Sequence, residues 1–270
     1  MKLLAYNILE GGLGRIDPLA EVIRQSDPDL VIAPEASDET EFAKLASRLG
    51  MDYFRAQNPR DPLGAVGLLV KPPYEIREAA NLTALEPRFT RAVLQATITF
   101  PPNSSTPAFH LLGVHFHARE TLADEAIRLA ELAALLAFAQ PLYDARLPFA
   151  LAGDFNAHHP DQPIDLAKTR PSTLARIAPQ NNVIPRDVIR TLLASHGGYL
   201  DTHTLTRAPA QFQTTLTTAH PTMRPDYIIV PAYLRTAVHR CDVIMGGPGA
   251  AGTLPKFASD HFPILADLSL

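Results

Sequence analysis

Apolar and polar positions alternate along the chain in blocks that predict strands and helices. Short apolar runs without a helix start signal are typical of buried strands. The segments that follow this pattern are 2–9, 29–37, 64–71, 91–100, 109–117, 148–152, 225–231 and 263–270. Several neighbouring runs are joined by short turn-forming segments, which indicates hairpins as well as crossover connections.

Four further segments have the period of a helix. Asp17 and Pro18 predict the start of a short helix, with Pro18 at its first position, which ends near residues 25–29. Segment 37–50 places apolar side chains on one face and Gly50 at its C-terminal cap. The longest helix is expected at 121–140, with Leu122, Leu129, Leu132 and Leu136 on one side and Pro141 ending it, and another at 186–197.

This order of elements favours mixed sheets covered by helices over a purely parallel, doubly wound sheet. We therefore expect an α/β layered sandwich. The chain has 270 residues and shows no internal repeat, low-complexity block or linker, so residues 1–270 are predicted to form one domain. The stretch 100–109, rich in Pro, Ser and Thr, is expected to be a hairpin loop.

Composition narrows the class of partner and the compartment. The chain has 24 basic and 28 acidic residues and a net charge of −4, which argues against binding nucleic acid through a broad basic surface. It does not exclude a nuclease, because bound cations add positive charge locally. Cys241 is the single cysteine, so no internal disulfide can form. With no transmembrane run or signal peptide, we expect a cytoplasmic monomer.

Polar residues interrupt or end many of the predicted strands. They are Asn7, Glu35, His115, His117, Asp154, Asn156, Asp226, Asp260 and His261. Each alone has an ordinary structural explanation, such as a satisfied edge amide or a turn residue. Together they indicate a site, because active sites of layered α/β folds collect at one edge of the sheets. Within "GDFN", Asp154 and Asn156 are expected to point to the same face, as alternate residues of a strand do.

The chemistry of this set is that of a metal and phosphate site. Carboxylate and amide oxygens are ligands that suit Mg²⁺ or Mn²⁺. Histidines paired with carboxylates can donate to a phosphate or protonate a leaving oxygen. The chain has no phosphate-binding loop of the G-x-x-x-x-G-K-[ST] type, no G-x-S-x-G and no cysteine–histidine zinc spacing, so those classes of site are excluded.

The ordered series "YNI", "PE", "VHFH", "GDFN", "RPDYIIV" and "SDHFPI" resembles the endonuclease/exonuclease/phosphatase superfamily, the DNase I-like proteins. The motifs extend from Asn7 to His261 and so cover nearly the whole chain. The resemblance implies a four-layered α/β sandwich, in which two packed mixed sheets are flanked by helices. It also implies hydrolysis of phosphate esters with Mg²⁺ or Mn²⁺.

Residue by residue, the resemblance implies a metal site and a set of catalytic groups. Glu35 matches the principal metal ligand, supported by Asn7 and Asp260. Asp154 matches the aspartate that orients or deprotonates the attacking water, and Asn156 would hold a phosphate oxygen. His261 would contact the scissile phosphate and be oriented by Asp226, and His115 matches a second histidine. His117, His158, His159 and Arg91 lie near these motifs, with substrate contact and structural roles both open.

Several branches of the superfamily do not fit. The chain has no "WCDR"-like element of inositol 5-phosphatases and no long apolar hairpin of secreted sphingomyelinases, and it lacks tryptophan, which abasic-site endonucleases use. In Arg224-Pro225-Asp226, a proline stands where the family usually has an apolar residue, so the strand is expected to start there. We expect a phosphodiesterase, including nuclease activity. A phosphomonoesterase for a small metabolite or lipid headgroup is the alternative, and a catalytically silent scaffold is the third.

Overall fold

The computed structural model describes residues 1–101, 104, 108–195, 198–207, 212–216, 223–246 and 254–270. Its strands form two six-stranded mixed sheets. In order across the first sheet they are β11 (Val238–Val243), β12 (Ile264–Leu268), β1 (Lys2–Ala5), β2 (Leu30–Pro34), β4 (Asp61–Val70) and β3 (Asp52–Asn58). The second sheet has β5 (Glu75–Asn81), β6 (Val93–Thr99), β7 (Ala108–His115), β8 (Phe149–Asp154), β10 (Asp226–Pro231) and β9 (Tyr199–Asp201).

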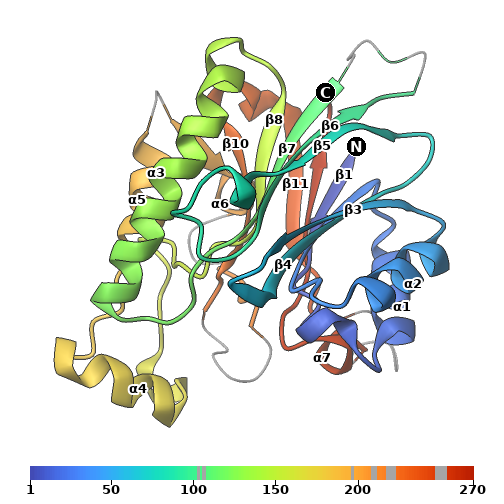
Figure 1. Ribbon diagram of the computed structural model, residues 1–270. Helices are drawn as coiled ribbons and strands as arrows, with labels where there is room; N and C mark the ends of the chain where they lie inside the picture. The colour runs from blue at the N-terminus through green and yellow to red at the C-terminus, as the bar shows by residue number, and fades with distance from the viewer. Residues whose placement is uncertain (102–103, 105–107, 196–197, 208–211, 217–222, 247–253) are drawn as a thin grey trace.

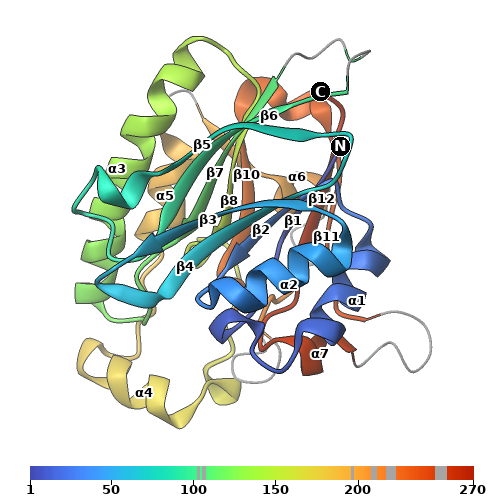
Figure 2. The same ribbon diagram turned by 45° about the vertical axis from the view of Figure 1, so that its right-hand side comes forward.

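Helices cover the outer face of each sheet (Figures 1 and 2). The first sheet carries α1 (Ile16–Ser26), α2 (Glu39–Leu49) and α7 (Leu254–Ala258), and the second carries α3 (Leu122–Asp144) and α5 (Asp187–Ala194). The short helices α4 (Pro171–Ile177) and α6 (Thr202–Thr206) lie in the connections after β8 and β9. The predicted four-layered α/β sandwich is confirmed. No helix in the described part of the chain has the length and apolarity needed to cross a bilayer.

Three apolar layers hold the sandwich together. The central layer lies between the sheets and contains inward side chains of both, such as Ile32, Leu68 and Leu94. The outer layers bury the apolar faces of the helices against each sheet. Because the interior strands are covered on both faces, they are apolar nearly throughout, which explains why β2 and β8 appear in the sequence as unbroken apolar runs.

Gly153 lets β8 approach β7 immediately before Asp154. Its φ is +131°, and a Cβ added there would lie 2.2 Å from the carbonyl oxygen of Val114 on β7. Only glycine fits this conformation and this contact. The glycine of "GDFN" therefore sets the position of the aspartate that follows it.

Several expected boundaries are wrong, each for a local reason. Pro141 lies inside α3, which continues to Asp144, because Pro141 is near the C-terminal end of a helix held by packing. Leu122 is exposed rather than on the buried side. Helix α1 begins at Ile16, so Pro18 is not its first residue. Helix α5 ends at Ala194, before the expected 197, although 196–197 lie outside the described residues.

The strands at 52–58, 75–81, 199–201 and 238–243 were not expected from the sequence. Strand β5 has an alternating, largely exposed pattern, and β9 has only three residues, so neither gives the apolar run of a buried strand. Strands β6 and β7 pair in antiparallel register, as the hairpin at 100–109 requires, although much of that loop lies outside the described residues.

Gly153→Ala is expected to lower the free energy of unfolding by about 1–3 kcal/mol more than Gly50→Ala does. Gly50 also has a positive φ, +65°, but has open space around its Cβ position, so its substitution costs only the backbone term of about 1 kcal/mol. Urea denaturation of both variants gives the two values. Equal losses would show that the contact with Val114 does not constrain β8.

Candidate active site

The candidate site lies at one edge of the sandwich, where the two sheets face each other. Parallel strands β1 and β2, and likewise β7 and β8, end at this edge, while the antiparallel strands β10 and β12 begin there. The first sheet supplies Asn7, Glu35, Asp260 and His261, and the second supplies His115, Asp154 and Asp226. Residues far apart in the sequence therefore meet because of strand direction.

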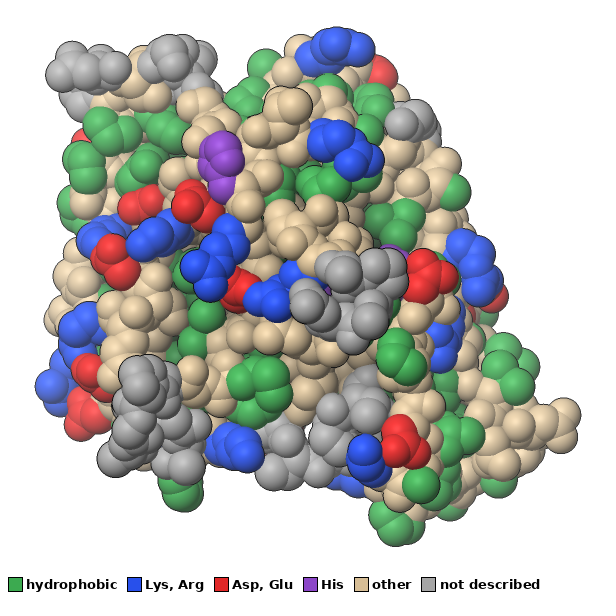
Figure 3. Space-filling view, turned by 180° about the vertical axis from the view of Figure 1, so that it is seen from behind, with side chains coloured by type: hydrophobic (Ala, Val, Ile, Leu, Met, Phe, Trp, Pro, Cys, Tyr) green, Lys and Arg blue, Asp and Glu red, His purple; other side chains and the backbone are tan. Residues whose placement is uncertain are grey.

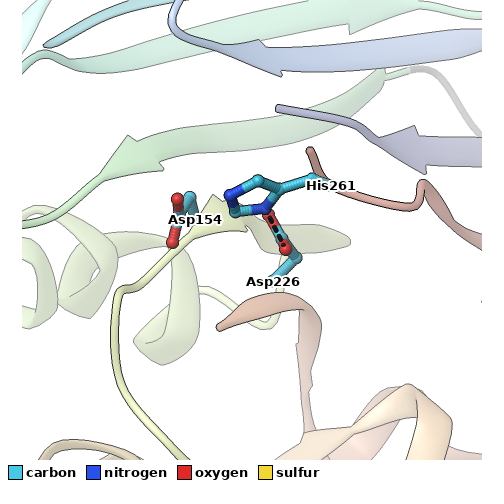
Figure 4. A group of neighbouring side chains, drawn as sticks. All are labelled: Asp154, Asp226 and His261. Carbon is cyan, nitrogen blue, oxygen red and sulfur yellow. Dashed lines mark hydrogen bonds and ion pairs between the residues drawn. The ribbon is translucent and has the colours of Figure 1, made fainter. Parts of the chain in front are cut away.

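At the centre of the site are Asp154, Asp226 and His261, whose ligand atoms all lie within 4.8 Å of one another (Figure 4). Asp154 and Asp226 are register partners on neighbouring strands, which brings the two carboxylates together. Nδ1 of His261 is 2.8 Å from Oδ2 of Asp226. All three side chains are buried, so their charges interact strongly.

Asn7 links this central group to Glu35. Its Nδ2 donates to Oε1 of Glu35 and to Oδ2 of Asp154, both at 3.1 Å. Asn7 lies two residues beyond the end of β1, not inside the strand as expected. Glu35 directly follows β2 with a φ of +62°, and its Oε2 accepts the backbone N–H of Glu10 at 2.9 Å. The turn after β2 thus aims this carboxylate at the site.

The surroundings raise the pKa of both Asp154 and His261, which favours the neutral form of the acid and the charged form of the imidazole. Burial, followed by the nearby carboxylate of Asp226, raises the pKa of Asp154 to about 6. Burial alone would lower the pKa of His261, but the charge and hydrogen bond of Asp226 and the charges of Asp154 and Asp260 raise it to about 10. At neutral pH His261 is therefore a cation beside carboxylates.

His115 is held between Arg91 and Asp154. Its Nε2 contacts the guanidinium of Arg91 and lies 3.8 Å from Oδ2 of Asp154. Burial, then the positive charges of Arg91 and His261, lower the pKa of His115 well below its usual value. A neutral ring with Nε2 accepting from Arg91 fits these contacts. Arg91 is not among the predicted site residues, although its position at the start of an apolar, strand-like run indicates a place near the site.

Asn156 does not share a strand face with Asp154, so that expectation is wrong. Strand β8 ends at Asp154, and Asn156 has a φ of +47°. The backbone N–H of Asn156 donates to Oδ1 of Asp154 at 2.8 Å, and its Nδ2 donates to the carbonyl of Phe116 at 2.9 Å. The chain turns sharply here, so Asn156 connects Asp154 to the segment that follows β7.

The other histidines lie outside the central group. Nε2 of His117 is 2.9 Å from Oδ1 of Asp124 at the start of α3, which gives it a structural partner. His158 and His159 are both buried, and the ring of His159 lies 5.2 Å from that of Phe212.

As expected, the strand carrying Asp226 starts directly after Pro225.

Asp260 precedes His261 in the turn before β12. Its Oδ1 is buried and has no hydrogen-bond partner within the described ranges. Ser259 fixes this turn, because its hydroxyl donates to the carbonyl of Asn7 at 2.7 Å and accepts the N–H of His261 at 3.1 Å. An unpartnered buried carboxylate oxygen is the kind of donor that binds a hard cation.

Comparison with known proteins agrees with the fold. Residues 4–261 match the model of the endonuclease/exonuclease/phosphatase family. A search of curated protein sequences gave no match. Similar solved structures include an AP endonuclease from Archaeoglobus fulgidus, with 16% identity, a TM-score of 0.72 and full coverage of both chains.

Two Bacteroides structures are similar as well. An endonuclease/exonuclease/phosphatase from Bacteroides vulgatus has 18% identity and a TM-score of 0.70, covering 100% of this chain and 98% of that one. The mannosyl-6-phosphatase of Bacteroides thetaiotaomicron has 14% identity and a TM-score of 0.65, with full coverage of both chains. At these identities the structures support the fold alone. On the strength of the family match, the chain belongs to the endonuclease/exonuclease/phosphatase family.

Proposed function

We propose that the protein, as one domain of residues 1–270, is a divalent-metal-dependent phosphodiesterase with nuclease activity. The observation that carries this proposal is the buried group of Asp154, Asp226 and His261. Asn7 links this group to Glu35, and Asp260 acts on His261 through its charge. Such a group combines a base of suitable pKa, a fixed cationic donor and oxygen ligands for a metal. Those are the parts that attack of water on phosphorus requires.

The residues present fit Mg²⁺ or Mn²⁺. Glu35 and Asp260 would hold the ion with support from Asn7, and the unpartnered Oδ1 of Asp260 is a ready oxygen donor. When bound, the ion supplies positive charge that stabilises the negative charge developing on the phosphate oxygens. No cysteine contributes, since the single cysteine, Cys241, lies in β11 and is buried. The donor set is therefore one for hard cations.

Asp154 is assigned to the attacking water. A carboxylate with a pKa of about 6 is largely ionised at neutral pH yet basic enough to accept a proton there. Its two oxygens are oriented by the backbone N–H of Asn156 and the Nδ2 of Asn7. These two donors hold the carboxylate in one orientation toward the substrate.

His261 is assigned to the phosphate. Asp226 takes its Nδ1, so Nε2 remains as the donor to a phosphate oxygen, and the imidazolium adds positive charge where negative charge develops. His115 and Asn156 complete the catalytic set: the first contacts Arg91 and the second ties the β8 turn to the β7 segment.

The site contains four carboxylates, from Glu35, Asp154, Asp226 and Asp260, against the cations His261 and Arg91. A bound divalent ion would balance this excess, so the charge of the loaded site accepts a monoanionic diester without repulsion. On the face seen in Figure 3, basic and acidic side chains are interspersed, so no broad basic field on that face directs the protein to long duplexes.

Hydrolysis of bis-p-nitrophenyl phosphate, compared with p-nitrophenyl phosphate, tests this function. With Mg²⁺ or Mn²⁺ we expect diester cleavage that EDTA abolishes. His261→Ala should reduce turnover by about 10²–10³-fold, because a preorganised donor at the phosphate is lost. His239→Ala, on the edge strand β11, serves as the control and should be unchanged. Preference for the monoester, or no loss in His261→Ala, would contradict the proposal.

Asp226→Asn is expected to lower the pKa of His261 from about 10, because the charge that stabilises the imidazolium is removed. The raised pKa contributes stability that is fully present below the ordinary pKa of 6.5 and is lost as pH rises through 10. NMR titration of the imidazole in metal-free protein measures the shift, with His239 as internal reference. An unmoved pKa would separate His261 from Asp226.

A further inference from the structure

Helix α3 buries three charged side chains that the catalytic set does not include. Glu125, Arg128 and Glu131 recur every three residues and are exposed by only 2%, 1% and 0%. This spacing places them on one face of the helix. Buried charges are costly unless they are paired and hydrogen-bonded. The hydrogen-bond partners of these three groups therefore indicate which part of the structure each charge stabilises.

Glu131 joins two separate backbone segments. Its Oε1 accepts the N–H of Thr90 at 2.9 Å and the hydroxyl of Thr90 at 2.7 Å. Its Oε2 accepts the N–H of His117 at 2.8 Å. One carboxylate thus receives three donors, two from the segment before β6 and one from the segment after β7.

Each of these segments carries a side chain of the site. Thr90 immediately precedes Arg91, and His117 lies two residues after His115. The guanidinium of Arg91 contacts Nε2 of His115, which lies 3.8 Å from Oδ2 of Asp154. The two segments are also joined directly, because the N–H of His115 donates to the carbonyl of Ala92 at 3.2 Å. Glu131 therefore fixes the strand ends from which the Arg91–His115 contact is built.

We propose that Glu131 is a positioning residue of the active site: its carboxylate sets Arg91 and His115 relative to Asp154. The expected effect of Glu131 on turnover rests on the phosphodiesterase function proposed above. Arg128 supports the same segment, since its NH1 donates to the carbonyl of His117 at 3.0 Å and to that of Arg119 at 2.5 Å.

Glu125 offers a matched comparison on the same helix. It is as buried as Glu131, but its Oε1 accepts the N–H of Val188 on α5 at 2.9 Å, and its Oε2 pairs with Arg128 at 2.7 Å. Glutamine at either position keeps one accepting oxygen and turns an NH₂ group toward a donor, so each change breaks one of the contacts. At 131 the lost contact is with Thr90 or His117, whereas at 125 it is with Val188 or Arg128.

The test compares turnover of bis-p-nitrophenyl phosphate with Mn²⁺ in a double-mutant cycle. Glu131→Gln should lower kcat by about 10- to 100-fold, as expected when reacting groups are misplaced by about 1 Å. In an Arg91→Ala background the same change should cost several-fold less, because the Arg91–His115 contact that Glu131 positions is absent. Glu125→Gln reaches the site only through Arg128 and should lower kcat less than Glu131→Gln does, and Gln140→Ala, near the C-terminal end of α3, should leave kcat unchanged. Equal losses in both backgrounds, or an unchanged kcat in Glu131→Gln, would overturn the proposal.

Two further measurements keep the proposal testable if Glu131→Gln folds poorly or the substrate is wrong. Thr90→Val removes only the hydroxyl donor and should lower kcat by about threefold. In metal-free protein, the imidazole nitrogen resonances of His115 should move in Glu131→Gln and Thr90→Val but not in Gln140→Ala. Unmoved His115 resonances would overturn the positioning role. A wild type without diesterase activity, but with these resonance shifts, would reject the proposed function and retain the role of Glu131.

Discussion

The hydrogen bonds of Asn7 hold the two halves of the site in one geometry. Its single amide nitrogen donates to Glu35, which follows a strand of the first sheet, and to Asp154, which ends a strand of the second. Asn7 is fully buried, so its bond to buried Asp154 is shielded from water, and its bond to half-buried Glu35 is shielded in part. The metal-binding and water-activating sides that we propose are thereby kept at a fixed separation by one side chain.

The sandwich also concentrates negative charge in a place that water cannot screen. Asp154 and Asp226 are register partners, and their mutual repulsion helps to raise the pKa of Asp154 to about 6. His261 compensates by remaining protonated between them. A cation bound at Glu35 and Asp260 would relieve the remaining excess of carboxylates. A divalent cation would therefore neutralise the excess of carboxylates in the metal-free site and also supply the positive charge that the proposed reaction uses.

The fold and the members of the site could largely be predicted from the sequence, since buried strands give clear apolar runs and polar residues at their ends are conspicuous. Finer geometry could not. The strand rule failed at Asn156 because β8 stops at Asp154 and the backbone turns into a positive φ, which depends on contacts with the segment after β7. The role proposed for Glu131 could not be predicted, because its helix is rich in alanine and leucine and its partners, Thr90 and His117, lie 41 and 14 residues away along the chain.

A crystal structure grown with Mn²⁺, in which anomalous scattering locates the ion, tests the proposed metal site most directly. We expect an anomalous peak at coordination distance from carboxylate oxygens of Glu35 and Asp260 and close to Asn7. His261 should remain paired to Asp226. A peak elsewhere in the molecule, or none at saturating Mn²⁺, would contradict the claim that this edge of the sandwich is a metal-dependent phosphoesterase site.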